Sequence, residues 1–260
     1  MTVRGARRAV GAGGGPLLVL LVSVGLCVAV VTRATAHEPA VLDPHRATPS
    51  VRLELVEAPP TAASALASPS YRLVATGLPD GMIFNVWTRD YGHSFHEAAS
   101  GFRKDETGRL VAVRHRNRPA QYLDELVLEP GPYPRGAIWE VALASEDRTI
   151  TAFATVIPRP IATRDGACVV SLELVSHRGE RFLARGSGFV PGTEVRVESQ
   201  YAGRVTRRIQ RASADGHLPP DVLIHAAATA SDNRALYTVK AGSCAVVLEY
   251  AWGRPALRPN

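Results

Sequence analysis

Aromatic residues are scarce in this chain of 260 residues, where Phe, Trp and Tyr together make up 6%. Lysine is rarer still: Lys104 and Lys240 are the only two, and every other basic side chain is arginine. Proteins that bind single-stranded nucleic acid interleave aromatic rings with basic residues so that the bases can stack. The basic runs of this sequence contain few such rings, and we therefore expect no nucleic-acid partner.

Long apolar runs are also missing. A helix that crosses a bilayer needs about 20 apolar residues, and the most apolar stretch, residues 17–31, is shorter. It follows an arginine-containing start and precedes the small residues Ala34 and Ala36. This order is typical of a secretory signal peptide, which we predict over residues 1–36. If the signal is not cleaved, it would anchor the chain, and we expect no other membrane contact.

Acidic residues are absent from the predicted signal, which holds four arginines. The net charge of the whole chain is +6, but residues 37–260 contain 26 basic and 24 acidic residues. Much of the basic character therefore belongs to the targeting segment, which further weakens a nucleic-acid interpretation.

Cysteine is rare too, and one of the three, Cys27, lies in the predicted signal. Cys168 and Cys244 remain in the exported part. An even number of cysteines in an exported protein favours a disulfide. The bond would close a loop of about 75 residues and stabilise the fold by about 4 kcal/mol in the chain-entropy model. The alternative is a pair of buried free thiols.

The chain carries an internal repeat. The tetrapeptide Leu-Glu-Leu-Val stands at residues 53–56 and again at residues 172–175. A Gly-Pro-Gly turn, an Asp-Gly turn, a short apolar strand and a hairpin follow each copy in the same order. The turn residues of the first copy are Gly77, Pro79 and Gly81. Those of the second copy are Gly188, Pro191 and Gly192. Five features in one order indicate two related modules.

Each module has the pattern of short β-strands. Apolar and polar residues alternate with a period of two, and Gly, Pro, Asn and Asp separate the runs. No amphipathic helix of about ten residues or more is visible after the signal. We predict an all-β fold with two tandem sandwiches. The predicted boundaries are a flexible stalk at 37–50, sandwich 1 at 51–158, a linker at 159–166, sandwich 2 at 167–253 and a tail at 254–260.

The turn of the second module has a recognisable form. Gly186, Gly188, Phe189, Pro191 and Gly192 make a Gly-x-Gly-Phe-x-Pro-Gly pattern that leads into a strand. It resembles the immunoglobulin-like modules of bacterial exported and surface proteins, including the IPT/TIG type. The resemblance implies two tandem immunoglobulin-like β-sandwiches used for adhesion, spacing or scaffolding, usually without catalysis. The first module departs from the pattern, with Leu in place of Phe.

One loop, residues 91–101, offers chemistry. His93, His96 and Glu97 could ligate a metal, but a zinc site needs three or four converging ligands, and the sequence shows no partner cluster. Ser94 begins like the nucleophile of a Gly-x-Ser-x-Gly elbow, but His96 stands where the second glycine belongs. We expect a polar loop at the tip of the sandwich, with no cofactor. An enzyme or metal-binding accessory protein with its site at this loop is the alternative.

A second candidate is the basic run at residues 203–211. Its arginines are Arg204, Arg207, Arg208 and Arg211. On an edge strand they would prevent edge-to-edge pairing with another chain. Alternatively they form a patch for anionic polymers or lipid head groups.

From these observations we expect a secreted or extracytoplasmic, non-catalytic binding, adhesion or spacer protein. Its partner would be a cell-envelope protein or an anionic polysaccharide.

Overall fold

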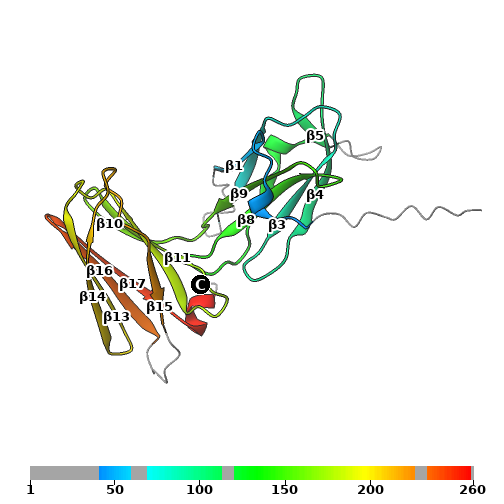
Figure 1. The fold of residues 1–260 in the computed structure, drawn as a ribbon. Helices are drawn as coiled ribbons and strands as arrows, with labels where there is room; N and C mark the ends of the chain where they lie inside the picture. Colours follow the sequence, from blue (N-terminus) through cyan, green and yellow to red (C-terminus); the bar gives the residue numbers. More distant parts are fainter. Residues whose placement is uncertain (1–40, 60–68, 113–119, 226–232, 259–260) are drawn as a thin grey trace, which may run out of the picture. The chain divides into compact units, whose positions relative to one another are not determined.

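The computed structural model describes residues 41–59, 69–112, 120–225 and 233–258, and these residues form an all-β fold. Their strands make four antiparallel sheets (Figure 1). The helical elements of these ranges are short 3-10 turns, and none of them is long and apolar enough to cross a membrane. The predicted signal, residues 1–36, lies outside the described residues.

Residues 52–156 form two of the sheets, which we call the N-terminal sandwich. One sheet has the order β1-β2-β7, and the other has the order β6-β5-β4-β3-β8-β9. The strands of the smaller sheet are β1 (Arg52–Glu57), β2 (Tyr71–Thr76) and β7 (Val127–Leu128). Those of the larger are β3 (Phe84–Arg89), β4 (His96–Lys104), β5 (Leu110–Ala112), β6 (Gln121–Tyr122), β8 (Trp139–Ser145) and β9 (Thr151–Val156). Leu73, Phe84 and Trp139 are buried in the core.

Residues 161–251 form the other two sheets, the C-terminal sandwich. The orders are β10-β11-β12-β15 and β14-β13-β16-β17. The first sheet contains β10 (Ile161–Asp165), β11 (Cys168–Leu174), β12 (Arg181–Ser187) and β15 (Asp221–Ile224). The second contains β13 (Glu194–Tyr201), β14 (Arg204–Arg211), β16 (Arg234–Ala241) and β17 (Cys244–Ala251). Alternate residues of β11 and β13 are buried, as the period of a strand with one face on the core requires.

The two sandwiches repeat one strand order. The order β1-β2-β7 corresponds to β11-β12-β15, and β4-β3-β8-β9 corresponds to β14-β13-β16-β17. Strands β5 and β6 extend the larger sheet of the first sandwich, while β10 is added at the edge of the second. The sequence repeat therefore has a direct structural counterpart, apart from these additions.

Two glycines occupy the same place in both modules. Gly77 and Gly188 have φ values of +76° and +80°, and each lies against the start of its module's strand β1 or β11. A Cβ at Gly77 would stand 2.0 Å from the carbonyl oxygen of Ser50, and one at Gly188 would stand 1.9 Å from that of Ala167. Only glycine combines this φ with so close an approach.

Because Gly77 and Gly188 make the same contact, their partners Ser50 and Ala167 are equivalent positions of the two modules. This equivalence corrects the alignment of the two sequence copies. It pairs Leu53 with Val170, whereas the Leu-Glu-Leu-Val match pairs Leu53 with Leu172. The tetrapeptide match is thus two residues out of structural register. The shift leaves the buried face unchanged, because strand side chains alternate with a period of two.

The turns that follow these glycines are also alike. Leu78 and Phe189 come directly after them and are buried in the cores, while Pro79 and Pro191 are exposed. Gly81 and Gly192 have φ values of +74° and +73°, and a Cβ at either would meet nothing within 4 Å. These later glycines serve the turn conformation alone.

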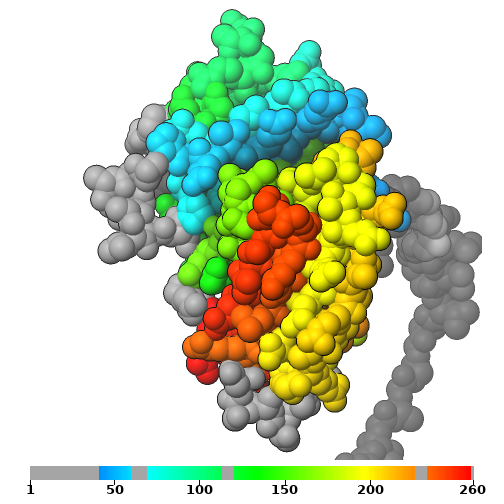
Figure 2. Space-filling model, turned by 90° about the vertical axis from the view of Figure 1, so that its left-hand side faces the viewer, coloured from blue at the N-terminus to red at the C-terminus, as the bar shows by residue number. Residues whose placement is uncertain are grey.

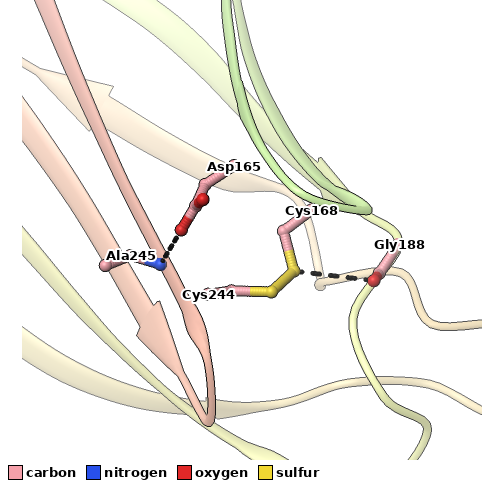
Figure 3. Close-up of a disulfide and its surroundings, with 5 residues drawn as sticks. All are labelled: Asp165, Cys168, Gly188, Cys244 and Ala245. Carbon is pink, nitrogen blue, oxygen red and sulfur yellow. Dashed lines mark hydrogen bonds between the residues drawn. A yellow bond between two sulfur atoms is a disulfide. The ribbon is translucent and has the colours of Figure 1, made fainter.

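The disulfide between Cys168 and Cys244 is present, with a Cα–Cα distance of 6.2 Å (Figure 3). It joins β11 of one sheet to β17 of the facing sheet. Cys168 does not lie in an edge strand, because β10 pairs outside β11. Beside the bond, the Ala245 amide donates a 2.7 Å hydrogen bond to Asp165 at the end of β10. The last strand, β17, is thus tied to both β11 and β10.

The predicted stalk, linker and tail are partly built into the fold. Of the predicted stalk, residues 37–40 lie outside the described residues, but Leu42 packs on Ala142 and Ala144. The predicted linker at 159–166 contains strand β10, which pairs with β11. The predicted tail forms the 3-10 helix η3 (Arg254–Leu257), whose Ala256 is buried. In each case a few apolar side chains are enough to fix the segment on its sandwich.

Candidate functional site

The loop with the predicted chemistry gathers only some of its residues: His93 and His96 line one pocket of about 540 Å³, and Glu97 is not part of its lining. His96 and Glu97 are consecutive residues of β4, opposite Thr88 and Trp87 respectively, so they face opposite sides of the sheet. A 3.0 Å hydrogen bond joins the His96 Nε2 to the Thr88 hydroxyl. The backbone of His93 closes a turn by donating to the Asp90 carbonyl. Within the described ranges, no three His, Cys, Asp or Glu residues are arranged to hold a metal ion.

The same loop has a packing role through Tyr91. Its hydroxyl donates to the carbonyl of Ser176, and its ring centroid lies 5.3 Å from that of His177. Burial raises the pKa of Tyr91 to about 12, so the phenol stays protonated and remains a donor. Tyr91 therefore holds the loop to the turn that follows β11.

The four arginines of the basic run lie on β14, an edge strand, but they do not share a face. Residues directly opposite each other in an antiparallel pair point the same way. Arg208 is opposite the buried Val197, whereas Arg207 is opposite Glu198 and Arg211 is opposite Glu194. The alternation therefore puts Arg207 and Arg211 on the outer face, and Arg204 and Arg208 on the side of the core. A single patch made of all four is not formed.

Arg208 reaches a buried acid. Its guanidinium lies 2.7 Å from the carboxylate of Asp221, whose side chain is only 3% exposed. The hydroxyl of Tyr237 donates to the same carboxylate at 3.3 Å. Burial, and then the charge of Asp221, raise the pKa of Tyr237, which keeps this donor protonated. Because Asp221 belongs to β15, the network links the two facing sheets at an edge of the C-terminal sandwich.

The outer arginines are paired with acids of the neighbouring strand. Arg207 donates to Glu198 at 2.8 Å, and a nitrogen of Arg211 lies 3.7 Å from a carboxylate oxygen of Glu194. All these side chains are partly or largely exposed, and such pairs contribute about 0–1 kcal/mol. They neutralise most of the charge that the sequence shows in this run.

A different pair of cations has no acidic partner among the described residues. Arg196 of β13 and Lys240 of β16 lie directly opposite each other on the outer face of the sheet β14-β13-β16-β17. Neither forms an ion pair within the part of the chain that the structure describes. Together with Glu198, Arg207, Ile209 and Thr238 they line a groove of about 600 Å³. Figure 2 faces this sheet, with β13 and β14 in yellow beside β16 and β17 in orange to red.

Sequence reasoning missed this pair because its members belong to strands far apart in the chain. Alternation in residues 194–201 does predict that Arg196 faces solvent. Its neighbour, however, depends on the pairing register of β13 with β16, which no local pattern reveals.

A buried histidine lies at the end of β15. His225 is 1% exposed, and its Nε2 is 2.8 Å from the hydroxyl of Tyr250. Its ring is surrounded by those of Phe182, Tyr201, Tyr250 and Trp252. Burial lowers the pKa of His225 to about 4, so the imidazole is neutral near pH 7. Its surroundings make it a core residue of the C-terminal sandwich.

No protein-family model matches the chain, and no curated protein matches it. Among solved structures it is similar to a "tetra-tandem repeat in extending region of large adhesion protein", with 10% sequence identity and a TM-score of 0.24. That match covers 77% of this chain and 47% of the other. It is also similar to part of "a 1.5-MDa bacterial ice-binding adhesin", with 9% identity and a TM-score of 0.22. The second match covers 78% of this chain and 64% of the adhesin chain.

The chain thus spans about half of the first of these structures and less than two thirds of the second. At TM-scores this low, neither likeness carries an argument about the function of this chain.

Proposed function

We propose that the chain is an exported, non-catalytic binding, adhesion or spacer protein built of two tandem immunoglobulin-like sandwiches. The observation that carries the proposal is the repeated strand order. Seven strands are shared by the two modules. In the first module they form the sheets β1-β2-β7 and β4-β3-β8-β9, and in the second they form β11-β12-β15 and β14-β13-β16-β17. This is the arrangement of immunoglobulin-like domains that have an added strand beside strand C. A module used twice in series suits extension and recognition.

Two features support export. The first is the arginine-containing, apolar segment at residues 1–36, which has the composition of a secretory signal. The second is the disulfide between Cys168 and Cys244, because structural disulfides persist in oxidising compartments.

The geometry of the histidine loop supports a role without catalysis. A catalytic or metal site needs its side chains to converge, whereas His96 and Glu97 face opposite sides of β4. Tyr91, from the same loop, is engaged in packing.

The experiment uses cells that make the chain, cells that lack it, and cells that make the His93→Ala/His96→Ala variant. Cell fractions are treated with a thiol-alkylating reagent without reductant, and attachment of the cells to surfaces is measured. We expect wild-type protein outside the cytoplasm, with Cys168 and Cys244 unmodified. Attachment should fall when the chain is absent and should be unchanged in the double variant.

Reduced protein confined to the cytoplasm would overturn export. If cells that lack the chain attach as well as wild-type cells, the adhesion function is overturned, and a spacer function is the part of the proposal that still stands. Loss of attachment by a folded, exported histidine variant would favour the enzyme or metal-site alternative.

A further inference from the structure

We propose that the outer face of the sheet β14-β13-β16-β17 docks an acidic protein segment, with Arg196 and Lys240 as its anion-binding pair. The inference rests on the proposed binding function and gives it a surface and a class of partner. We call this face the docking face. Its charged members are Glu194, Arg196, Glu198, Arg207, Arg211, Arg234, Lys240 and Glu249.

The charge on the docking face is unbalanced at one place. Its five cations face three acids: Arg207 and Arg211 of β14 engage Glu198 and Glu194, and Arg234 engages Glu249. The surplus of positive charge therefore falls on Arg196 and Lys240. Like charges placed directly opposite each other destabilise a sheet. An anionic group bound between the two side chains would relieve the repulsion and satisfy their donors.

The groove provides the room for such a group. Arg196 stands in its middle strand, with Lys240 on one side and Ile209 on the other. Its volume of about 600 Å³ exceeds what one carboxylate needs and would hold several side chains of a bound segment. Arg196 and Lys240 are exposed, so no rearrangement of the core is required for binding.

Apolar side chains on the same face favour a protein segment over a polysaccharide. Val205, Ile209 and Val247 are 46%, 68% and 54% exposed, and Ile209 lies directly opposite Arg196. The aliphatic side chains of an acidic peptide would cover them, whereas a sulfated sugar chain would leave them in water. In the described strands this face carries no aromatic ring on which a sugar or a base could stack.

The test measures binding by the full chain of a labelled peptide of alternating Glu and Val residues. We expect the Arg196→Ala/Lys240→Ala variant to bind about tenfold more weakly or worse, and added salt to weaken the wild type. The matched control is Arg181→Ala/Arg185→Ala, which removes two positive charges from exposed positions of β12 in the opposite sheet. It should bind like the wild type. Ile209→Ser should also weaken peptide binding, since it removes the apolar wall of the groove.

Heparin and phosphatidylserine vesicles are the comparison probes. The proposal is overturned if the wild type does not bind the peptide, or if the β12 control loses as much affinity as the docking-face variant. It is also overturned if heparin or the vesicles bind more tightly than the peptide, with the same dependence on Arg196 and Lys240. These outcomes concern the surface only, because export and attachment are measured separately.

Discussion

Gly188 lies so close to Ala167 that a single added methyl group would stand 1.9 Å from the Ala167 carbonyl oxygen. Gly77 has the same relationship to Ser50 in the other sandwich. In the first module this contact holds the turn before β3 against the start of β1. In the second module it holds the turn before β13 against the start of β11.

Substitution of Gly188 by alanine should be strongly destabilising. Alanine at a left-handed φ costs about 1–2 kcal/mol, and forcing the two backbones apart adds about 1–3 kcal/mol. Gly192→Ala is the matched control, because its φ is also positive but its Cβ would meet nothing within 4 Å. Urea unfolding of the two variants should show the larger loss at Gly188. Equal losses of unfolding free energy in the two variants would mean that the positive φ alone causes the destabilisation. Gly77→Ala and Gly81→Ala repeat the comparison in the N-terminal sandwich.

Removal of the disulfide should lower the stability of the C-terminal sandwich. Cys168→Ala/Cys244→Ala opens a covalent loop with a sequence separation of 76, which in the chain-entropy model is worth about 4 kcal/mol. Thermal unfolding with and without reductant measures the effect. Reductant should lower the Tm of the wild type and leave that of the double variant unchanged. A wild type that is insensitive to reductant, while mass measurement shows its thiols free, would contradict this role.

Loss of Arg208 should cost far more than loss of its neighbour Arg207. Arg208→Ala leaves the buried carboxylate of Asp221 without its cation, at a cost of about 2–3 kcal/mol. Arg207→Ala removes only an exposed pair, worth about 0–1 kcal/mol. The two variants have the same change in charge, and chemical denaturation compares them directly. Similar effects would argue that Asp221 finds another donor.

Stability should fall as the pH is lowered from about 6.5 to about 4, because of His225. Its pKa is about 4 in the fold, and the ordinary value is 6.5. Within this window the unfolded chain binds a proton that the folded chain refuses, so protonation favours unfolding. The loss of folding stability caused by His225 reaches about 3 kcal/mol near pH 4 and does not grow further at lower pH. Above about pH 6.5 this loss is absent.

Urea unfolding of wild type and of His225→Phe between pH 4 and 8 checks this expectation. The variant should keep the pH dependence that carboxylates cause and lose the part between pH 4 and 6.5. Parallel curves for the two proteins would show that His225 is protonated in the folded state without penalty.

The local signals of the sequence were enough for much of this fold. Alternation predicted the all-β class, and the even number of cysteines after the predicted signal predicted the disulfide between Cys168 and Cys244, which is confirmed. Features that depend on pairing between distant strands were not accessible. The two-residue error in aligning Leu53 is one example, since a shift of two leaves the buried face unchanged. The position of β10 outside β11 is another, because a Pro-rich boundary resembles a linker.

The candidate site shows the same division. The arginine run was visible as a local cluster, yet alternation along β14 sends Arg208 to the side of the core and Arg207 to solvent. The unbalanced pair, Arg196 and Lys240, is created by the register between β13 and β16. Pairing register depends on the whole sheet, and no window of the sequence contains it.

The bond between Cys168 and Cys244 also sets how the C-terminal sandwich would respond to mechanical tension. A pull applied to the chain before β11 and after β17 would pass through the covalent link. The strands between the two cysteines would then carry almost no load and would stay folded. Residues 51–158 contain no cysteine, so under the same force the N-terminal sandwich would be the one to lengthen.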